Sequence, residues 1–113
     1  MTEQAKKYLF DILLAIDAID DFLTGINYLQ YENDLKTRSA VERQLVIIGE
    51  AVNKFNKIET QINLSNAREI INFRNRLVHA YDSIDDSIVW AIKINHLPEL
   101  KNEIESILNH KIK

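Results

Sequence analysis

The chain has 113 residues, of which 46% are hydrophobic and 27% are charged, and its formal net charge is −3. These proportions exclude an intrinsically disordered protein, and the negative charge argues against a general nucleic-acid-binding protein. The absence of cysteine excludes disulfides and thiolate metal sites. The low content of glycine (two) and proline (one) favours helices over a turn-rich β architecture.

The N-terminal part of the chain predicts a long amphipathic helix. Between residues 3 and 26 the apolar residues recur in steps of three and four, which is the spacing of one helix face. Asp11, Asp17, Asp20 and Asp21 interrupt this run, so no window is long enough to span a bilayer. Because no signal peptide is recognisable either, we expect a cytoplasmic protein without a membrane partner.

A second long helix is predicted over residues 36–57, after one or two short turns in 26–34. Its apolar stripe consists of Val41, Leu45, Ile48, Val52 and Phe55. Gly49 lies within this helix, where glycine costs about 1 kcal/mol relative to alanine. We interpret Gly49 as a position where another backbone comes close.

Three more helices are expected over residues 65–81, over 84–96 and from Pro98 onward, because proline suits the first turn of a helix. The short connections predict an all-α antiparallel bundle of four to five helices, in one domain spanning residues 1–113. Residues 36–76 form the only basic segment, with eight basic and four acidic side chains. Charge alone favours a solvated helix surface over a phosphate site there.

The stretch NFRNRLVHAYDS, residues 72–83, places polar side chains where the third helix should bury apolar ones. Arg74 falls in the middle of the apolar stripe, so its guanidinium needs a partner or an open cleft. Glu50, next to Gly49, is the candidate structural partner of Arg74. His79 lies about 140° round a regular helix from Arg74, so the pair shares no face. Either the helix breaks near residue 79 or a second subunit completes the site.

Each of these side chains also has a purely structural interpretation. Arg74 can form a buried ion pair, His79 can bind a carbonyl at the helix end, and Tyr81 can be a core phenol. Their proximity in the sequence favours a functional site, because such polar groups cluster where function lies.

The motif R-N-x-x-x-H-x-Y is formed by Arg74, Asn75, His79 and Tyr81. It resembles the ribonuclease motif of HEPN domains, and most closely that of the HepT-type toxins of MNT–HEPN toxin–antitoxin systems. Two other stretches are similar to blocks of the same family: D-I-L-x-A-I-x-x-I over residues 11–19, and A-V-E-R-Q-L-V-I-I-G-E-A-V over 40–52. Phe73 departs from the small residue that often precedes the arginine.

The resemblance implies a HEPN-like homodimer that cleaves RNA at its subunit interface, without a metal or another cofactor. RNA suits this chemistry because its 2′-hydroxyl can attack the adjacent phosphate. Arg74 and His79 would be catalytic, since a guanidinium stabilises the charge that develops on phosphorus and an imidazole transfers protons near neutral pH. Asn75 and Arg76 would position the RNA phosphate.

The resemblance also implies a protein partner. In the family, the cognate antitoxin is a minimal nucleotidyltransferase of the MNT type, which neutralises the toxin by AMPylation of the motif tyrosine. That residue would be Tyr81, and the added phosphate would fill a cleft meant for RNA. No metal site is expected, because His79, His96 and His110 show no ligand spacing.

Two other functions are compatible with these residues. One is a non-catalytic helical module that binds a nucleotide or a nucleotidyltransferase, in which Arg74 serves only phosphate binding or structure. The other is a helical scaffold in which the ion pair between Arg74 and Glu50 is structural. Arg38 and Arg43 are weaker candidates for contact with the RNA backbone.

Overall fold

The computed structural model describes residues 1–112 of the chain, and the side chains of residues 1–109. Every regular element in this part of the chain is helical. The molecule measures 44 × 29 × 19 Å. No helix within the described residues has both the length and the apolar character needed to cross a bilayer.

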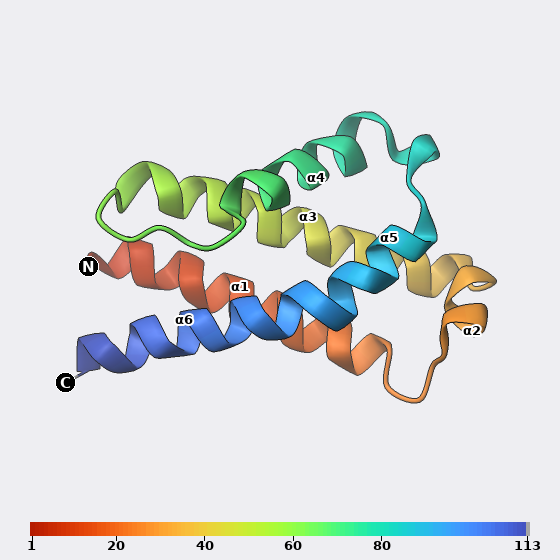
Figure 1. The fold of residues 1–113 in the computed structure, drawn as a ribbon, viewed down its shortest axis with the longest axis horizontal. Coiled ribbons are helices and arrows are strands. Elements are labelled where there is room, and N and C mark those ends of the chain that lie inside the picture. The colour runs from red at the N-terminus through yellow and green to blue at the C-terminus, as the bar shows by residue number, and fades with distance from the viewer. Residues whose placement is uncertain (113) are drawn as a thin grey trace.

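Four long helices build the molecule. α1 (Glu3–Phe22) and α3 (Leu35–Ile58) run antiparallel and form the most extensive helix contact. α4 (Ala67–His79) lies on α3, and α6 (Leu97–Ile112) lies beside α1 (Figure 1). The prediction of an all-α antiparallel helical bundle is therefore confirmed.

The core confirms the apolar stripes predicted for the first two long helices. All five stripe residues of α3 are buried, from Val41 to Phe55. Their spacing of three and four residues puts them on one face, and that face packs on α1. The buried residues of α1 are Ala5, Leu9, Ile12, Ala15, Ile16 and Ile19.

Short elements connect the long helices. α2 (Tyr28–Glu32) precedes α3, and its N-cap Asn27 forms a capping box with Gln30. The single 3₁₀ turn η1 (Tyr81–Ser83) follows α4 and leads to α5 (Asp86–Ala91). The N-cap of α5 is Asp85, whose side chain accepts a hydrogen bond from the backbone N–H of Ser87.

The C-terminal helices differ from the prediction of two separate elements. α5 continues without a loop through the π-helical turn η2 (Ile92–His96) into α6. The backbone N–H of Leu97 donates to the carbonyl of Ile92, five residues earlier. Pro98 has no N–H to donate and its ring crowds the carbonyl four residues before it, and a widened π turn accommodates both effects.

Candidate functional site

α3 and α4 meet where Gly49 of α3 faces Arg74 of α4. A Cβ atom added at Gly49 would overlap the Cβ of Arg74 and would lie 2.7 Å from its Cγ. It would also approach the carbonyl oxygen of Ile70, at 3.5 Å. Gly49 therefore allows α4 to sit close to α3, as its place in the middle of a helix predicted, and it directs the side chain of Arg74 across α3.

The guanidinium of Arg74 is held by two side chains. Its Nη1 donates to Oδ1 of Asn75 at 2.8 Å, and its Nη2 donates to Oε1 of Glu50 at 3.4 Å. The side chains of Arg74 and Glu50 are 27% and 40% exposed, so the ion pair is half-buried rather than buried. The Nε of Arg74 is buried and has no hydrogen-bond partner among the described residues. The guanidinium of Arg74 is therefore oriented by two side chains, on a side chain that is only partly buried.

α4 ends at His79. Ala80 has φ −145° and ψ 42°, which is not helical, and its N–H donates to the carbonyl of Arg76 at 2.8 Å. The imidazole of His79 and the guanidinium of Arg76 are both exposed. Because the helix ends only after His79, Arg74 and His79 both belong to α4, and the helix end does not bring their side chains onto one face.

Tyr81 lies outside the core, and its interpretation as a core phenol is wrong. Its side chain is 71% exposed. The apolar stripe of α4 cannot reach Tyr81 because the helix stops two residues earlier, and the stripe residue Val78 is also 45% exposed. The turn that carries Tyr81 is closed by Ser83, whose N–H and hydroxyl both donate to the carbonyl of Ala80.

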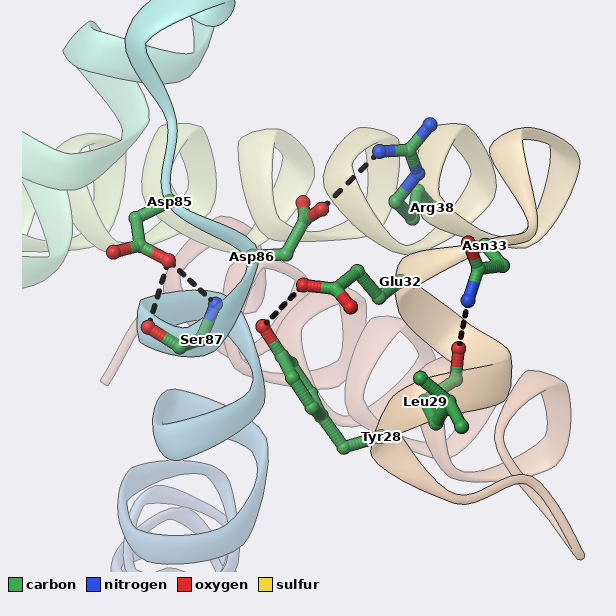
Figure 2. A network of polar contacts seen from close by, with 8 residues as sticks. All are labelled: Tyr28, Leu29, Glu32, Asn33, Arg38, Asp85, Asp86 and Ser87. Atoms are coloured by element: carbon green, nitrogen blue, oxygen red, sulfur yellow. Dashed lines mark hydrogen bonds and ion pairs between the residues drawn. The ribbon is translucent and has the colours of Figure 1, made fainter.

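An ion pair fixes the far end of the segment that carries Tyr81. Figure 2 shows Arg38 of α3 reaching Asp86, the first residue of α5, with Nη1 and Oδ2 3.1 Å apart. Arg38 was a weaker candidate for contact with RNA, and its guanidinium is instead committed to this pair. Asp86 fixes the start of α5 through this pair, and the sequence does not predict it, because no local spacing relates two residues 48 positions apart.

A mainly apolar cavity lies beside α4, and Arg74 is not among its lining residues. Its volume is about 270 Å³, and it lies between α3, α4 and the η2–α6 segment. Phe73 and Ile70 form its α4 wall, while Leu97 and Leu100 form its α6 wall. The bulky Phe73 packs against the core, about 100° round α4 from Arg74.

No group of three or more histidine, aspartate or glutamate side chains suited to a metal ion occurs within the described part of the chain. His79 and His96 are both exposed and come from different elements. The side chain of His110 lies outside the described residues. The groups in contact with the guanidinium of Arg74 are thus the amide of Asn75 and the carboxylate of Glu50, and the exposed imidazole of His79 ends the same helix.

The sequence profile of the family described as "Ribonuclease HepT-like" matches residues 12–107 of the chain. "Probable ribonuclease HepT" of Thermococcus cleftensis is 35% identical over 111 residues, which cover 95% of this chain and 98% of that protein. "Putative RNase MJ0125" of Methanocaldococcus jannaschii is 35% identical over 104 residues, 91% of this chain and 90% of that protein. "Putative RNase TTE0752" of Caldanaerobacter subterraneus is 30% identical over 105 residues, 91% and 93% of the two chains. No solved structure gives a significant match.

Proposed function

The chain belongs to the HepT-like ribonuclease family, and from this premise we propose that it is a metal-independent endoribonuclease, the toxin of a cytoplasmic toxin–antitoxin system. The predicted resemblance is thereby confirmed at the level of the family. The observation that carries the proposal is the partly exposed side chain of Arg74, whose guanidinium is held by Asn75 and Glu50, on the helix that ends in the exposed His79.

The proposed reaction is an attack of the RNA 2′-hydroxyl on the adjacent phosphorus. A bond forms between the 2′ oxygen and phosphorus, and the bond from phosphorus to the 5′ oxygen breaks. The 2′-hydroxyl loses a proton and the leaving 5′ oxygen gains one; His79 carries one of these two transfers, as base or as acid, and solvent water carries the other. Arg74 stabilises the negative charge that develops on the phosphoryl oxygens, because its guanidinium is always charged and presents two parallel donors. Asn75 and Arg76 position the phosphate.

We further propose that two copies of the chain share the site. Arg74 and His79 lie about 140° apart round the axis of α4, so one regular helix does not aim both at one phosphate. Support comes from Val78 and Tyr81, whose side chains are 45% and 71% exposed beside these residues. Subunits carrying Arg74→Ala would then regain cleavage when mixed with subunits carrying His79→Ala. If the mixture of the two variants does not cleave RNA, each site is built from the Arg74 and His79 of one chain.

The proposed antitoxin is a nucleotidyltransferase of the MNT type that transfers AMP to Tyr81. The exposure of the Tyr81 side chain supports this role, since a transferase must reach the phenol oxygen. In the transfer, that oxygen forms a bond to the α-phosphorus of ATP, pyrophosphate leaves and the phenol proton is lost. The phosphate added to Tyr81 would place negative charge next to the residues proposed to bind RNA phosphate.

The direct test is RNA cleavage by the purified protein in EDTA. We expect the wild-type protein to cleave RNA, and Arg74→Ala and His79→Ala to abolish cleavage. His96→Ala is a matched control, because His96 is also exposed but lies in η2. Cleavage at the wild-type rate in both site variants would overturn the assignment. Absence of cleavage together with tight binding to a nucleotidyltransferase would favour the non-catalytic module instead.

A further inference from the structure

The solvent-facing side of α3 carries a row of basic residues that the proposed mechanism does not use. We define the basic face of α3 by its four members: Lys36, Arg43, Lys54 and Lys57. At about 100° per residue these positions fall within an arc of about 60°, and at 1.5 Å per residue they extend over about 32 Å. All four side chains are exposed, on the side of the helix away from the buried stripe.

The charges of the basic face are free to meet a ligand. None of the four residues forms an ion pair within the described part of the chain. Glu50 lies in the same arc, four residues before Lys54, which is the spacing that favours an ion pair on a helix. Its carboxylate nevertheless pairs with Arg74 of α4. Lys36 is also in the first turn of α3, where the helix dipole disfavours a cation, so helix stability does not explain the row.

The basic face passes next to the proposed catalytic arginine. Glu50, which holds the guanidinium of Arg74, is seven residues from Arg43 and four from Lys54, or about 10 Å and about 6 Å along the helix axis. A polyanion lying along α3 would therefore meet Arg74 between two unpaired cations.

A shallow hollow continues this surface toward α1. It has a volume of about 110 Å³ and is lined by Glu50 and Lys54 of α3 and by Lys7, Tyr8 and Asp11 of α1, among other residues. Lys7 is paired with Asp11 at 2.9 Å, so Lys54 supplies the unpaired positive charge of the hollow. The four charged residues that line the hollow sum to zero, but because Glu50 pairs with Arg74, Lys54 is the one cation of the hollow without a partner among the described residues.

We propose that the basic face of α3 is the track along which single-stranded RNA reaches Arg74. This inference rests on the proposed ribonuclease function, and it names the residues that bind the substrate away from the cleaved bond. The ligand is a chain of phosphates because a row of unpaired cations matches it, and a single strand because its backbone is flexible enough to enter a site beside α4. Contacts of this kind are independent of sequence and sensitive to salt.

The test measures RNA binding in a protein that cannot cleave. A fluorescently labelled single-stranded RNA of mixed sequence is titrated with the full chain carrying His79→Ala, and the dissociation constant is followed by anisotropy over a series of salt concentrations. Adding Lys54→Ala and Lys57→Ala should weaken binding roughly tenfold and reduce the slope of log affinity against log salt by about 1.4, since each lost phosphate contact removes about 0.7.

The matched control is Lys93→Ala with Lys101→Ala in the same background. It changes the formal charge by the same amount, but Lys93 lies in η2 and Lys101 lies in α6. Lys93 lies 5.3 Å from the ring centre of Trp90 and Lys101 pairs with Asp17, and neither belongs to the basic face. We expect the control to bind RNA as the parent does, with the same salt slope. Thermal unfolding of both double variants verifies that they fold.

The outcomes separate this inference from the proposed function. If the wild-type protein cleaves RNA but the two double variants bind RNA equally, the proposal that RNA binds along the basic face of α3 is wrong, and the proposed ribonuclease function is retained. If the wild-type protein does not cleave and only the α3 variant loses RNA binding, the track stands and the ribonuclease is wrong. An α3 variant that binds RNA as the parent does, yet loses an acidic protein partner, would overturn the track in favour of a protein interface.

Discussion

The Cβ and Cγ atoms of Arg74 occupy the space above Gly49 where a side chain of α3 would otherwise be. This contact sets the separation of α3 and α4 at the one point where a basic side chain replaces an apolar one. It also determines the direction of the guanidinium, which then meets Glu50 and Asn75. A backbone property of one helix thus places the side chain that we propose for catalysis on another.

The contact predicts that Gly49→Ala lowers the free energy of unfolding. The overlap with Arg74 should cost about 1–3 kcal/mol, which exceeds the gain in helix propensity of about 1 kcal/mol. In a background of Arg74→Gly the overlap is gone, and the same Gly49→Ala change should then stabilise the protein. Urea unfolding of the four proteins measures both effects. A stabilising effect of Gly49→Ala in both backgrounds would show that the close packing of α4 on α3 does not require a glycine at position 49.

The half-exposed ion pair predicts that Arg74 matters little for stability. Arg74→Met keeps the aliphatic stem over Gly49 and removes the charge. The free energy of unfolding should therefore fall by less than about 1 kcal/mol. RNA cleavage should fall about 100-fold or more. Arg68→Met is the control, because Arg68 is an exposed residue of the same helix. A loss of several kcal/mol in Arg74→Met would support the scaffold interpretation.

Glu42 gives a prediction about pH. Burial, followed by the nearby carboxylate of Asp86, raises the pKa of Glu42, and Arg38 partly opposes this shift. A group whose pKa is raised by folding contributes stability that is full below its unfolded pKa and is lost as pH rises through its folded pKa. Glu42→Gln should therefore melt at a higher temperature than the wild type at pH 7, and the difference should vanish near pH 4, close to the ordinary glutamate pKa of about 4.3.

Thermal melts of both proteins over this pH range measure the effect. Glu105→Gln, which removes an exposed carboxylate of α6, is the control for the change in net charge. A lower melting temperature for Glu42→Gln at pH 7 would mean that Glu42 has a stabilising partner in the folded protein.

The exposure of Tyr81 predicts where the protein is modified. Co-expression with a nucleotidyltransferase of the MNT type should increase the mass of the protein by one or more AMP units, and Tyr81→Phe should abolish the increase. Tyr28→Phe should leave it intact, since Tyr28 is half-buried and its hydroxyl donates to Glu32. An unchanged mass increase in Tyr81→Phe would place the modification elsewhere.

The sequence was sufficient for the parts of the fold that depend on local spacing. The period of the apolar residues predicted the buried stripes of α1 and α3, and the position of Gly49 predicted a close approach of another helix. The same period placed Arg74 on the inner side of α4, where its side chain is only 27% exposed.

The sequence was insufficient where contacts are distant or where a helix ends without a stop signal. Neither glycine nor proline follows His79, and Ala80 is a good helix former, so nothing in the spacing predicted an exposed Tyr81. The pair of Arg38 and Asp86 joins two residues 48 positions apart and depends on where the tertiary fold places the start of α5. The roles of Arg74, Asn75, Arg76, His79 and Tyr81 in catalysis and regulation stay predictions.

The chemical nature of the RNA ends tests the central claim most directly. Attack by the 2′-hydroxyl leaves a 2′,3′-cyclic phosphate on one fragment and a 5′-hydroxyl on the other. Mass spectrometry of a defined RNA, cleaved in EDTA, should show these two ends with the wild-type protein and no products with His79→Ala. Fragments with 3′-hydroxyl and 5′-phosphate ends, or the same products from His79→Ala, would contradict the proposed roles of the 2′-hydroxyl and His79.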